Sequence, residues 1–206
     1  MKIIFAATPD ISISCLEEIL NSSHEIGLIL TMPDKPTGRG KKFLPGPIKK
    51  FCLENNLPFV QPKNLKSIEV KNIFKKVESD LLIVFAYGKI IPNDIFDLPT
   101  YGSINVHTSI LPSYRGAAPI QRAIINGEKF TGITFMKLSE GLDEGPIIES
   151  FKVAIEEEET SGSLAEKMAK VSSREILQTI ENIELNNIIY TEQDHSKASY
   201  ADKLLK

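Results

Sequence analysis

The chain has 206 residues, which suits one α/β domain or one domain and a tail, and its hydrophobic content of 42% is ample for a core. No apolar run is long enough to cross a membrane, and the first residues resemble a buried strand rather than a signal peptide. The net charge is −3, and its uneven distribution, a basic island on an acidic body, suggests a local anionic partner rather than general polyanion affinity. Cys15 and Cys52 lack metal or redox spacing and indicate reduced thiols of a cytoplasmic protein.

The first half of the chain alternates apolar strands with amphipathic helices. We expect strands at 2–8, 25–31, 58–61 and 80–86, and helices at 11–20, 48–55 and 65–77. This order predicts an α/β fold with a Rossmann-like open sheet that is mostly parallel. No G-x-G-x-x-G follows the first strand, so the sequence does not support dinucleotide binding.

A long connection, residues 32–47, interrupts this pattern and is too rich in proline and glycine for a regular element. The window from Asp34 to Lys50 holds six basic residues and one acidic residue, so it carries +5 while the remainder carries −8. Two interpretations are equally good from charge alone. The connection is either a solvated, mobile loop or a basic finger that contacts phosphates, with Arg39 free to approach a backbone because glycines flank it.

The strand at 80–86 is continuously apolar, as in a central parallel strand covered on both faces. It ends in the sequence Tyr-Gly-Lys-Ile-Ile-Pro at 87–92. Open α/β sheets bind ligands beyond the carboxyl ends of their strands, so this backbone is a candidate wall for a flat heterocycle. An ordinary strand-to-helix turn would explain the glycine and the proline equally well.

The next strand ends in Asn-x-His at residues 105–107. Side chains alternate along a strand, so Asn105 and His107 extend from the same face. An amide beside a titratable ring can hold and protonate a carbonyl oxygen. The alternative is that Asn105 caps a turn and His107 is a satisfied core histidine.

The second half continues with a helix at 119–126, strands at 131–138 and 146–153 that suit a hairpin, and a helix from 161 to about 183. A tight acidic loop at 139–145 carries Asp143 between the two strands. Asn105, His107 and Asp143 together would support acyl transfer to an amine, with the first two stabilising the oxyanion and Asp143 orienting His107 and passing protons through water. No dense cluster of metal ligands is present in the sequence.

Several motifs resemble those of the folate-dependent formyltransferases. They are Asn-x-His at 105–107, Ser-Ile-Leu-Pro at 109–112, Arg-Gly-Ala-Ala-Pro-Ile-Gln at 115–121, Gly-Leu-Asp-Glu-Gly at 141–145 and Gly-Arg-Gly-Lys-Lys at 38–42. The resemblance covers essentially the whole chain. It is strongest to the branch of the family that acts on methionyl-tRNA, because the 38–42 and 115–121 motifs are more specific to that branch.

The resemblance implies formyl transfer from 10-formyltetrahydrofolate to the α-amino group of methionyl-initiator-tRNA by a monomer that needs no metal. It implies catalytic roles for Asn105, His107 and Asp143, and tRNA binding by Arg39, Lys41 and Lys42. It also implies a folate site formed by nine residues: Ser109, Ile110, Leu111, Pro112, Tyr87, Gly88, Ile90, Ile91 and Leu142.

Two departures accompany the resemblance. Ala7 stands where the family commonly has glycine, and the family enzyme continues for about 100 more residues, a typical domain size. We therefore expect a catalytic domain at 1–185 and a linker or tail at 186–206 that leads toward an absent C-terminal β-barrel. A formyltransferase for glycinamide ribonucleotide or an amino sugar, a formyltetrahydrofolate hydrolase and a non-catalytic RNA-binding module are the competing functions.

Overall fold

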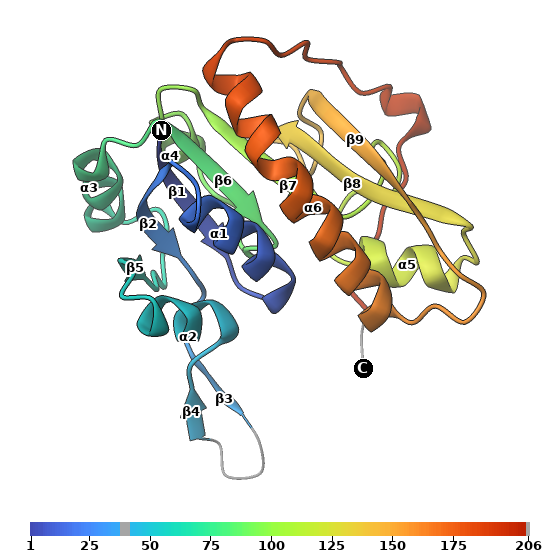
Figure 1. Ribbon diagram of the computed structural model, residues 1–206, viewed down its shortest axis with the longest axis horizontal. Coiled ribbons are helices and arrows are strands. Elements are labelled where there is room, and N and C mark those ends of the chain that lie inside the picture. Colours follow the sequence, from blue (N-terminus) through green and yellow to red (C-terminus); the bar gives the residue numbers. More distant parts are fainter. Residues whose placement is uncertain (38–41, 205–206) are drawn as a thin grey trace. The chain divides into compact units, whose positions relative to one another are not determined.

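The computed structural model describes residues 1–37 and 42–204 and divides into two compact units, Met1–Ser103 and Ile104–Lys206. We refer to them as unit 1 and unit 2. Figure 1 labels their helices and strands.

Unit 1 is a parallel sheet with helices. Its elements are β1 (Lys2–Ala7), a 3-10 turn (Asp10–Ser12), α1 (Ile13–Leu20), β2 (Glu25–Leu30), β3 (Lys35–Thr37), β4 (Lys42–Leu44), α2 (Pro47–Glu54), β5 (Phe59–Val60), α3 (Ile68–Val77), β6 (Leu81–Phe85) and α4 (Asn93–Phe96). Four strands pair in the order β5-β2-β1-β6, every pair parallel. This arrangement places the apolar strands β1 and β6 side by side, and their side chains belong to the buried core of the unit.

Unit 2 contains an antiparallel sheet. Its elements are β7 (Ser103–His107, which begins on the last residue of unit 1), α5 (Pro119–Ile125), β8 (Phe130–Lys137), β9 (Ile147–Ala154), α6 (Ser161–Glu184) and a 3-10 turn (His195–Lys197). β8 pairs with β7 on one side and β9 on the other. The long helix α6 begins at a capping box, in which the Thr160 and Ser163 side chains each accept a hydrogen bond from the other residue's backbone N–H. The apolar side of α6 is buried and contacts α5, β8 and β9.

The predicted α/β fold with a mostly parallel open sheet is confirmed, as is the β8–β9 hairpin. One expectation about the basic connection was wrong. Within it, β3 and β4 form a short antiparallel ribbon, with Lys35 opposite Leu44 and Pro36 opposite Phe43. A proline is compatible with this ribbon because an edge strand has a side that makes no ladder bonds.

Neither cysteine forms a disulfide, and both are buried, as expected. Burial raises the pKa of the Cys52 thiol to about 11, so this side chain stays protonated near neutral pH. Within residues 1–37 and 42–204, no helix is both long and apolar enough to span a membrane.

Gly132, in β8, is required by close packing rather than by backbone conformation. A Cβ atom at this position would lie 2.2 Å from the Phe151 carbonyl oxygen and 2.3 Å from Ile110 Cδ1. We expect Gly132→Ala to lower the free energy of unfolding by about 2 kcal/mol, because one strand or the Ile110 side chain must move. Urea denaturation followed by circular dichroism measures this loss.

Gly46→Ala is the matched control, because a Cβ atom there meets nothing within 4 Å. It should change the free energy of unfolding by less than about 0.5 kcal/mol. Equal free energies of unfolding for Gly132→Ala and Gly46→Ala would show that β8 or its neighbours can move to accept the added Cβ atom at no cost.

Candidate active site

Asn105 and His107 lie two residues apart near the end of β7. The register of β7 with β8 sets Asn105 opposite Met136 and His107 opposite Thr134. Because side chains alternate along a strand, the amide and the imidazole extend from the same face. Asn105 is half-buried, and His107 is only 5% exposed.

Asp143 approaches both side chains from the loop between β8 and β9. Asn105 Nδ2 donates to Asp143 Oδ1 at 3.5 Å, and His107 Nδ1 lies 3.6 Å from Asp143 Oδ2. These distances are at or just beyond the limit of a hydrogen bond, so the three groups face one another without closing a tight contact. Such loose geometry is common before a substrate is bound, and it leaves polar atoms available to a reacting group.

The other ring nitrogen of His107 determines the tautomer. Nε2 lies 2.9 Å from the Tyr114 carbonyl oxygen. A carbonyl oxygen can only accept a hydrogen bond, so Nε2 must carry a proton and donate it. Nδ1 is therefore the ring nitrogen that remains to serve a substrate beside Asp143.

Two non-glycine residues in the left-handed region shape this arrangement. Tyr114 has φ 61° and Asp143 has φ 52°. Each such residue costs on the order of 1–3 kcal/mol unless its surroundings compensate. Part of the compensation is a hydrogen bond of 2.8 Å from the Gly116 N–H to Asp143 Oδ2, which ties the turn after Tyr114 to the carboxylate.

Residues 109–112 form a closed turn between β7 and Tyr114. Ser109 is fully buried and its hydroxyl donates to the Ser113 carbonyl at 2.6 Å. Thr134 Oγ1 accepts from the Leu111 N–H at 3.2 Å and donates to the Ser109 carbonyl at 2.7 Å. Because their polar groups are satisfied internally, Ser109 and Leu111 are suited to shaping a binding surface.

The other predicted folate residues of unit 2 are more exposed. Ile110 and Pro112 are half-buried on the same turn, and Leu142, near Asp143, is 54% exposed.

In unit 1, the turn after β6 contains the other predicted folate residues. Ala86 and Gly88 have positive φ, and the Tyr87 carbonyl accepts from the Thr8 hydroxyl at 2.7 Å. Tyr87 and Ile91 are buried, whereas Ile90 is 84% exposed. Burial raises the pKa of Tyr87 to about 12, and its hydroxyl has no hydrogen-bond partner among the described residues.

The basic ribbon formed by β3 and β4 is anchored at its base. Asp34 bonds to Lys49 of α2 at 2.5 Å and to Gln61 Nε2 at 2.8 Å. The hydrogen bonds from Lys49 and then from Gln61 lower the pKa of Asp34. Phe43 is 69% exposed. Arg39 and Lys41 lie outside the described residues, and Lys42 is described only as a backbone position in β4.

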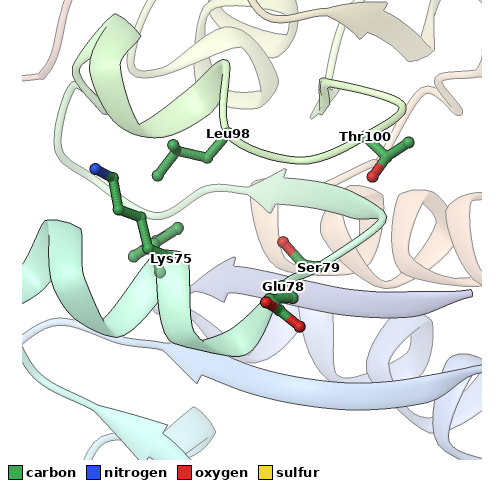
Figure 2. Close-up of a pocket in the computed structure, with 6 residues that line it drawn as sticks. Lys75, Glu78, Ser79, Leu98 and Thr100 are labelled. Atoms are coloured by element: carbon green, nitrogen blue, oxygen red, sulfur yellow. The ribbon is translucent and has the colours of Figure 1, made fainter.

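The described part of the chain contains no group of three or more histidine, cysteine, aspartate or glutamate side chains that could hold a metal ion. Figure 2 shows a pocket in unit 1. Its lining residues are Phe74, Lys75, Glu78, Ser79, Leu98 and Thr100, none of which is a predicted site residue.

Comparison with known proteins decides the family. The profile of the family described as formyl transferase matches residues 1–180. The chain belongs to this family. Among its relatives, the methionyl-tRNA formyltransferase of Dictyoglomus thermophilum is 47% identical over 207 residues, which is all of this chain and 66% of the relative. The chain thus spans slightly less than two thirds of that protein.

Solved structures of the family share the fold. A sugar 3N-formyltransferase, WlaRD, solved in the presence of dTDP and 5-N-formyl-THF, has a TM-score of 0.73 at 23% identity, and the match covers 98% of this chain and 69% of that one. Phosphoribosylglycinamide formyltransferase from Bacillus halodurans has a TM-score of 0.71 at 26% identity, with coverage of 90% and 95%.

Sequence reasoning missed part of the surroundings of Asp143 in this family member. The segment from Thr191 to Asp202, predicted as tail, is bonded into unit 2, where Gln193 donates to the Asp143 carbonyl at 2.9 Å and accepts from Arg115. Gln193 is 5% exposed and Arg115 is 1% exposed. A polar segment without periodicity gives no signal for such contacts. The predicted boundary between residues 185 and 186 stays a prediction.

The left-handed conformation of Asp143 predicts a difference between two substitutions. Asparagine tolerates this region and its side-chain oxygen can accept from the Gly116 N–H, whereas alanine does neither. We expect Asp143→Asn to change the free energy of unfolding by less than about 0.5 kcal/mol and Asp143→Ala to lower it by about 1–2 kcal/mol. Urea unfolding of both variants measures the difference, and equal losses would contradict the structural role given to this backbone.

Proposed function

We propose that the chain transfers a formyl group from 10-formyltetrahydrofolate to the α-amino group of methionyl-initiator-tRNA. The observation that carries this proposal is the convergence of Asn105, His107 and Asp143 in a chain that aligns along its full length with a methionyl-tRNA formyltransferase at 47% identity. The convergence favours an enzyme over a non-catalytic RNA-binding module, in which these polar groups would have no reason to meet.

The arrangement of the three side chains suits direct attack by an amine. The folate supplies the formyl group on its N10. As the amine nitrogen bonds to the formyl carbon, Asn105 Nδ2 and a protonated His107 Nδ1 donate to the oxygen on which negative charge develops. The Asp143 carboxylate orients the imidazole and, through a water molecule, accepts the proton that the attacking amine loses. That proton passes to N10 as its bond to the formyl carbon breaks, so charge and atoms balance without a serine or cysteine nucleophile.

Each of the two chain segments that the resemblance implies for the folate offers surface suited to part of that ligand. In unit 2, the closed turn at 109–112 and the exposed Leu142 provide apolar surface beside the reacting groups. In unit 1, the backbone of Tyr87, Gly88, Ile90 and Ile91 offers donors and acceptors for the edge of a flat heterocycle. The 5-N-formyl-THF present with the sugar formyltransferase WlaRD supports a folate as donor for this family.

The acceptor is assigned to tRNA on the basis of the basic ribbon. Arg39, Lys41 and Lys42 follow the exposed Lys35, and the exposed apolar Phe43 lies beside them in the sequence. Positive charge that contacts phosphates supplies most of the affinity for a nucleic acid. The residues at 38–42 therefore provide a contact for the acceptor end of the tRNA.

Glycinamide ribonucleotide is the second candidate acceptor. The chain covers 95% of the phosphoribosylglycinamide formyltransferase of Bacillus halodurans, so the two have similar lengths. This acceptor carries one phosphate and leaves the long basic connection at 32–47 without a partner. An assay with both acceptors and 10-formyltetrahydrofolate, with free folate release measured alongside, distinguishes the two and also detects hydrolysis. Product on glycinamide ribonucleotide alone would overturn the tRNA assignment.

Asn105→Ala and His107→Ala should each abolish measurable transfer, a loss of about 10³-fold or more in kcat, because each removes a donor to the developing charge. His107 is the last residue of β7 and Asn105 is half-buried, so the melting temperature should fall by only a few degrees. Single-turnover transfer of formyl to methionyl-tRNA measures the effect, and differential scanning calorimetry provides the folding control. Wild-type turnover in either variant would remove these residues from the catalytic group.

Arg39→Ala should lower kcat/KM for methionyl-tRNA by about 10- to 100-fold, because a guanidinium placed on a phosphate is lost, while KM for the folate stays unchanged. Arg174→Ala, on the exposed face of α6, is the matched control and should have no effect on either substrate. If Arg39→Ala instead impairs folate and tRNA use equally, the 38–42 segment serves folding rather than recognition.

A further inference from the structure

Gln193 is the most completely bonded side chain of the segment that follows α6. Its amide nitrogen donates to the Asp143 carbonyl at 2.9 Å and to the Gly145 carbonyl at 2.7 Å. Its amide oxygen accepts from Arg115 Nη2 at 2.7 Å and from Arg115 Nε at 3.1 Å. With both protons and its oxygen engaged, this amide has one fixed orientation.

Arg115 anchors the arrangement from the other side. Its guanidinium is 1% exposed and, besides Gln193, contacts Glu144 Oε1 at 3.4 Å and His195 Nδ1 at 3.4 Å. Its backbone is held as well, because Arg115 N–H donates to the Ser199 carbonyl at 2.8 Å and its carbonyl accepts from the Ala201 N–H at 2.7 Å. A buried guanidinium with a fixed backbone is a rigid support for the Gln193 amide.

Arg115 and Gln193 are therefore joined to both segments that contact the candidate catalytic groups, the turn at 114–116 and the loop that carries Asp143. Arg115 lies between Tyr114, whose carbonyl accepts from His107 Nε2, and Gly116, whose N–H donates to Asp143 Oδ2. Gln193 fixes the peptide planes that follow Asp143 and Gly145, and so constrains the left-handed backbone of Asp143. A side chain on a strained backbone keeps its direction only when its surroundings over-determine it.

We propose that Gln193, supported by the buried Arg115, is a positioning residue of the formyl-transfer site that directs the Asp143 carboxylate toward His107 and Asn105. The proposal rests on the proposed function, but its structural part does not require it. Residue 193 lies outside the region matched by the family profile, which ends at residue 180.

The Gln193→Glu variant tests whether Gln193 positions the Asp143 loop or only stabilises the fold. A carboxylate keeps the length of the side chain and accepts from Arg115, so the anchor remains. It cannot donate to the Asp143 and Gly145 carbonyls, so the hold on the catalytic loop is lost. Gln178→Glu is the matched control, since it makes the same chemical change at an exposed position of α6.

The activity measurement is steady-state formyl transfer to methionyl-tRNA. We expect kcat to fall by about 10- to 100-fold in Gln193→Glu, as when a catalytic group is displaced by about 1 Å, with KM for both substrates within about twofold. Gln178→Glu should match the wild type. If Gln193→Glu keeps wild-type kcat, the positioning role is overturned.

Amide hydrogen exchange provides a readout that needs no activity. The Gly116 N–H donates to the Asp143 carboxylate, whereas the Ala118 N–H, in the same loop, donates to the Ala201 carbonyl. In Gln193→Glu we expect exchange at Gly116 to become about tenfold faster while exchange at Ala118 is unchanged. Equal exchange at Gly116 in variant and wild type would overturn the proposal.

The two readouts separate the proposals. A wild type that transfers no formyl group to methionyl-tRNA overturns the proposed function, and the exchange at Gly116 alone then decides the role of Gln193. If Gln193→Glu does not fold, Gln193→Met, which keeps the length without adding a charge, carries the same expectations. Unfolding of both variants would overturn the proposal by making Gln193 a stability residue.

Discussion

The hydrogen bond from the Gly116 N–H to the Asp143 carboxylate is the interaction on which the candidate site depends. The Asp143 side chain is largely buried, with 15% of its surface exposed, and its shortest contact is this neutral backbone donor at 2.8 Å. A buried carboxylate that a dipole satisfies, rather than a tightly paired cation, keeps much of its negative charge available. That charge lies beside His107 Nδ1, where the proposed acyl transfer to an amine requires a proton to be held and moved.

Two strained residues set the geometry of this bond. Tyr114 and Asp143 both occupy the left-handed region, where a side chain is tolerated only if other contacts fix the backbone. For Tyr114 those contacts include the hydroxyl of Ser199, which accepts from its N–H at 2.9 Å, and Glu128, which accepts from its phenol at 2.6 Å. For Asp143 they are the Gly116 N–H and the amide of Gln193. The chain therefore uses residues far apart in sequence to hold the two turns on which the reacting groups depend.

The sequence predicted the elements whose signals are local. Period-two alternation placed Asn105 and His107 on one face of a strand, and a continuous apolar run identified β6 as a central parallel strand. The approach of Asp143 to His107 was a hypothesis that depended on how β8 pairs with both β7 and β9, because Asp143 lies in the loop of the β8–β9 hairpin and His107 lies on β7. The positive φ of Tyr114 gave no signal, since tyrosine is not a residue that marks a left-handed turn. Gln193 was missed because it is one polar residue in a polar segment, and it meets Asp143 across 50 positions of sequence.

The partners of Arg115 show how far along the chain the contacts around Asp143 extend. The predicted boundary at residue 185 would assign residues 186–206 to a linker, yet Arg115 has four of its five named partners there: Gln193 and His195 through its side chain, and Ser199 and Ala201 through its backbone. Without them, a guanidinium that is 1% exposed would be left with Glu144, which is itself 38% exposed. An uncompensated buried charge is among the most destabilising features a fold can contain. The physical unit that holds Asp143 in place therefore includes the segment through Ala201, whose N–H and carbonyl close the bonds to Arg115 and Ala118.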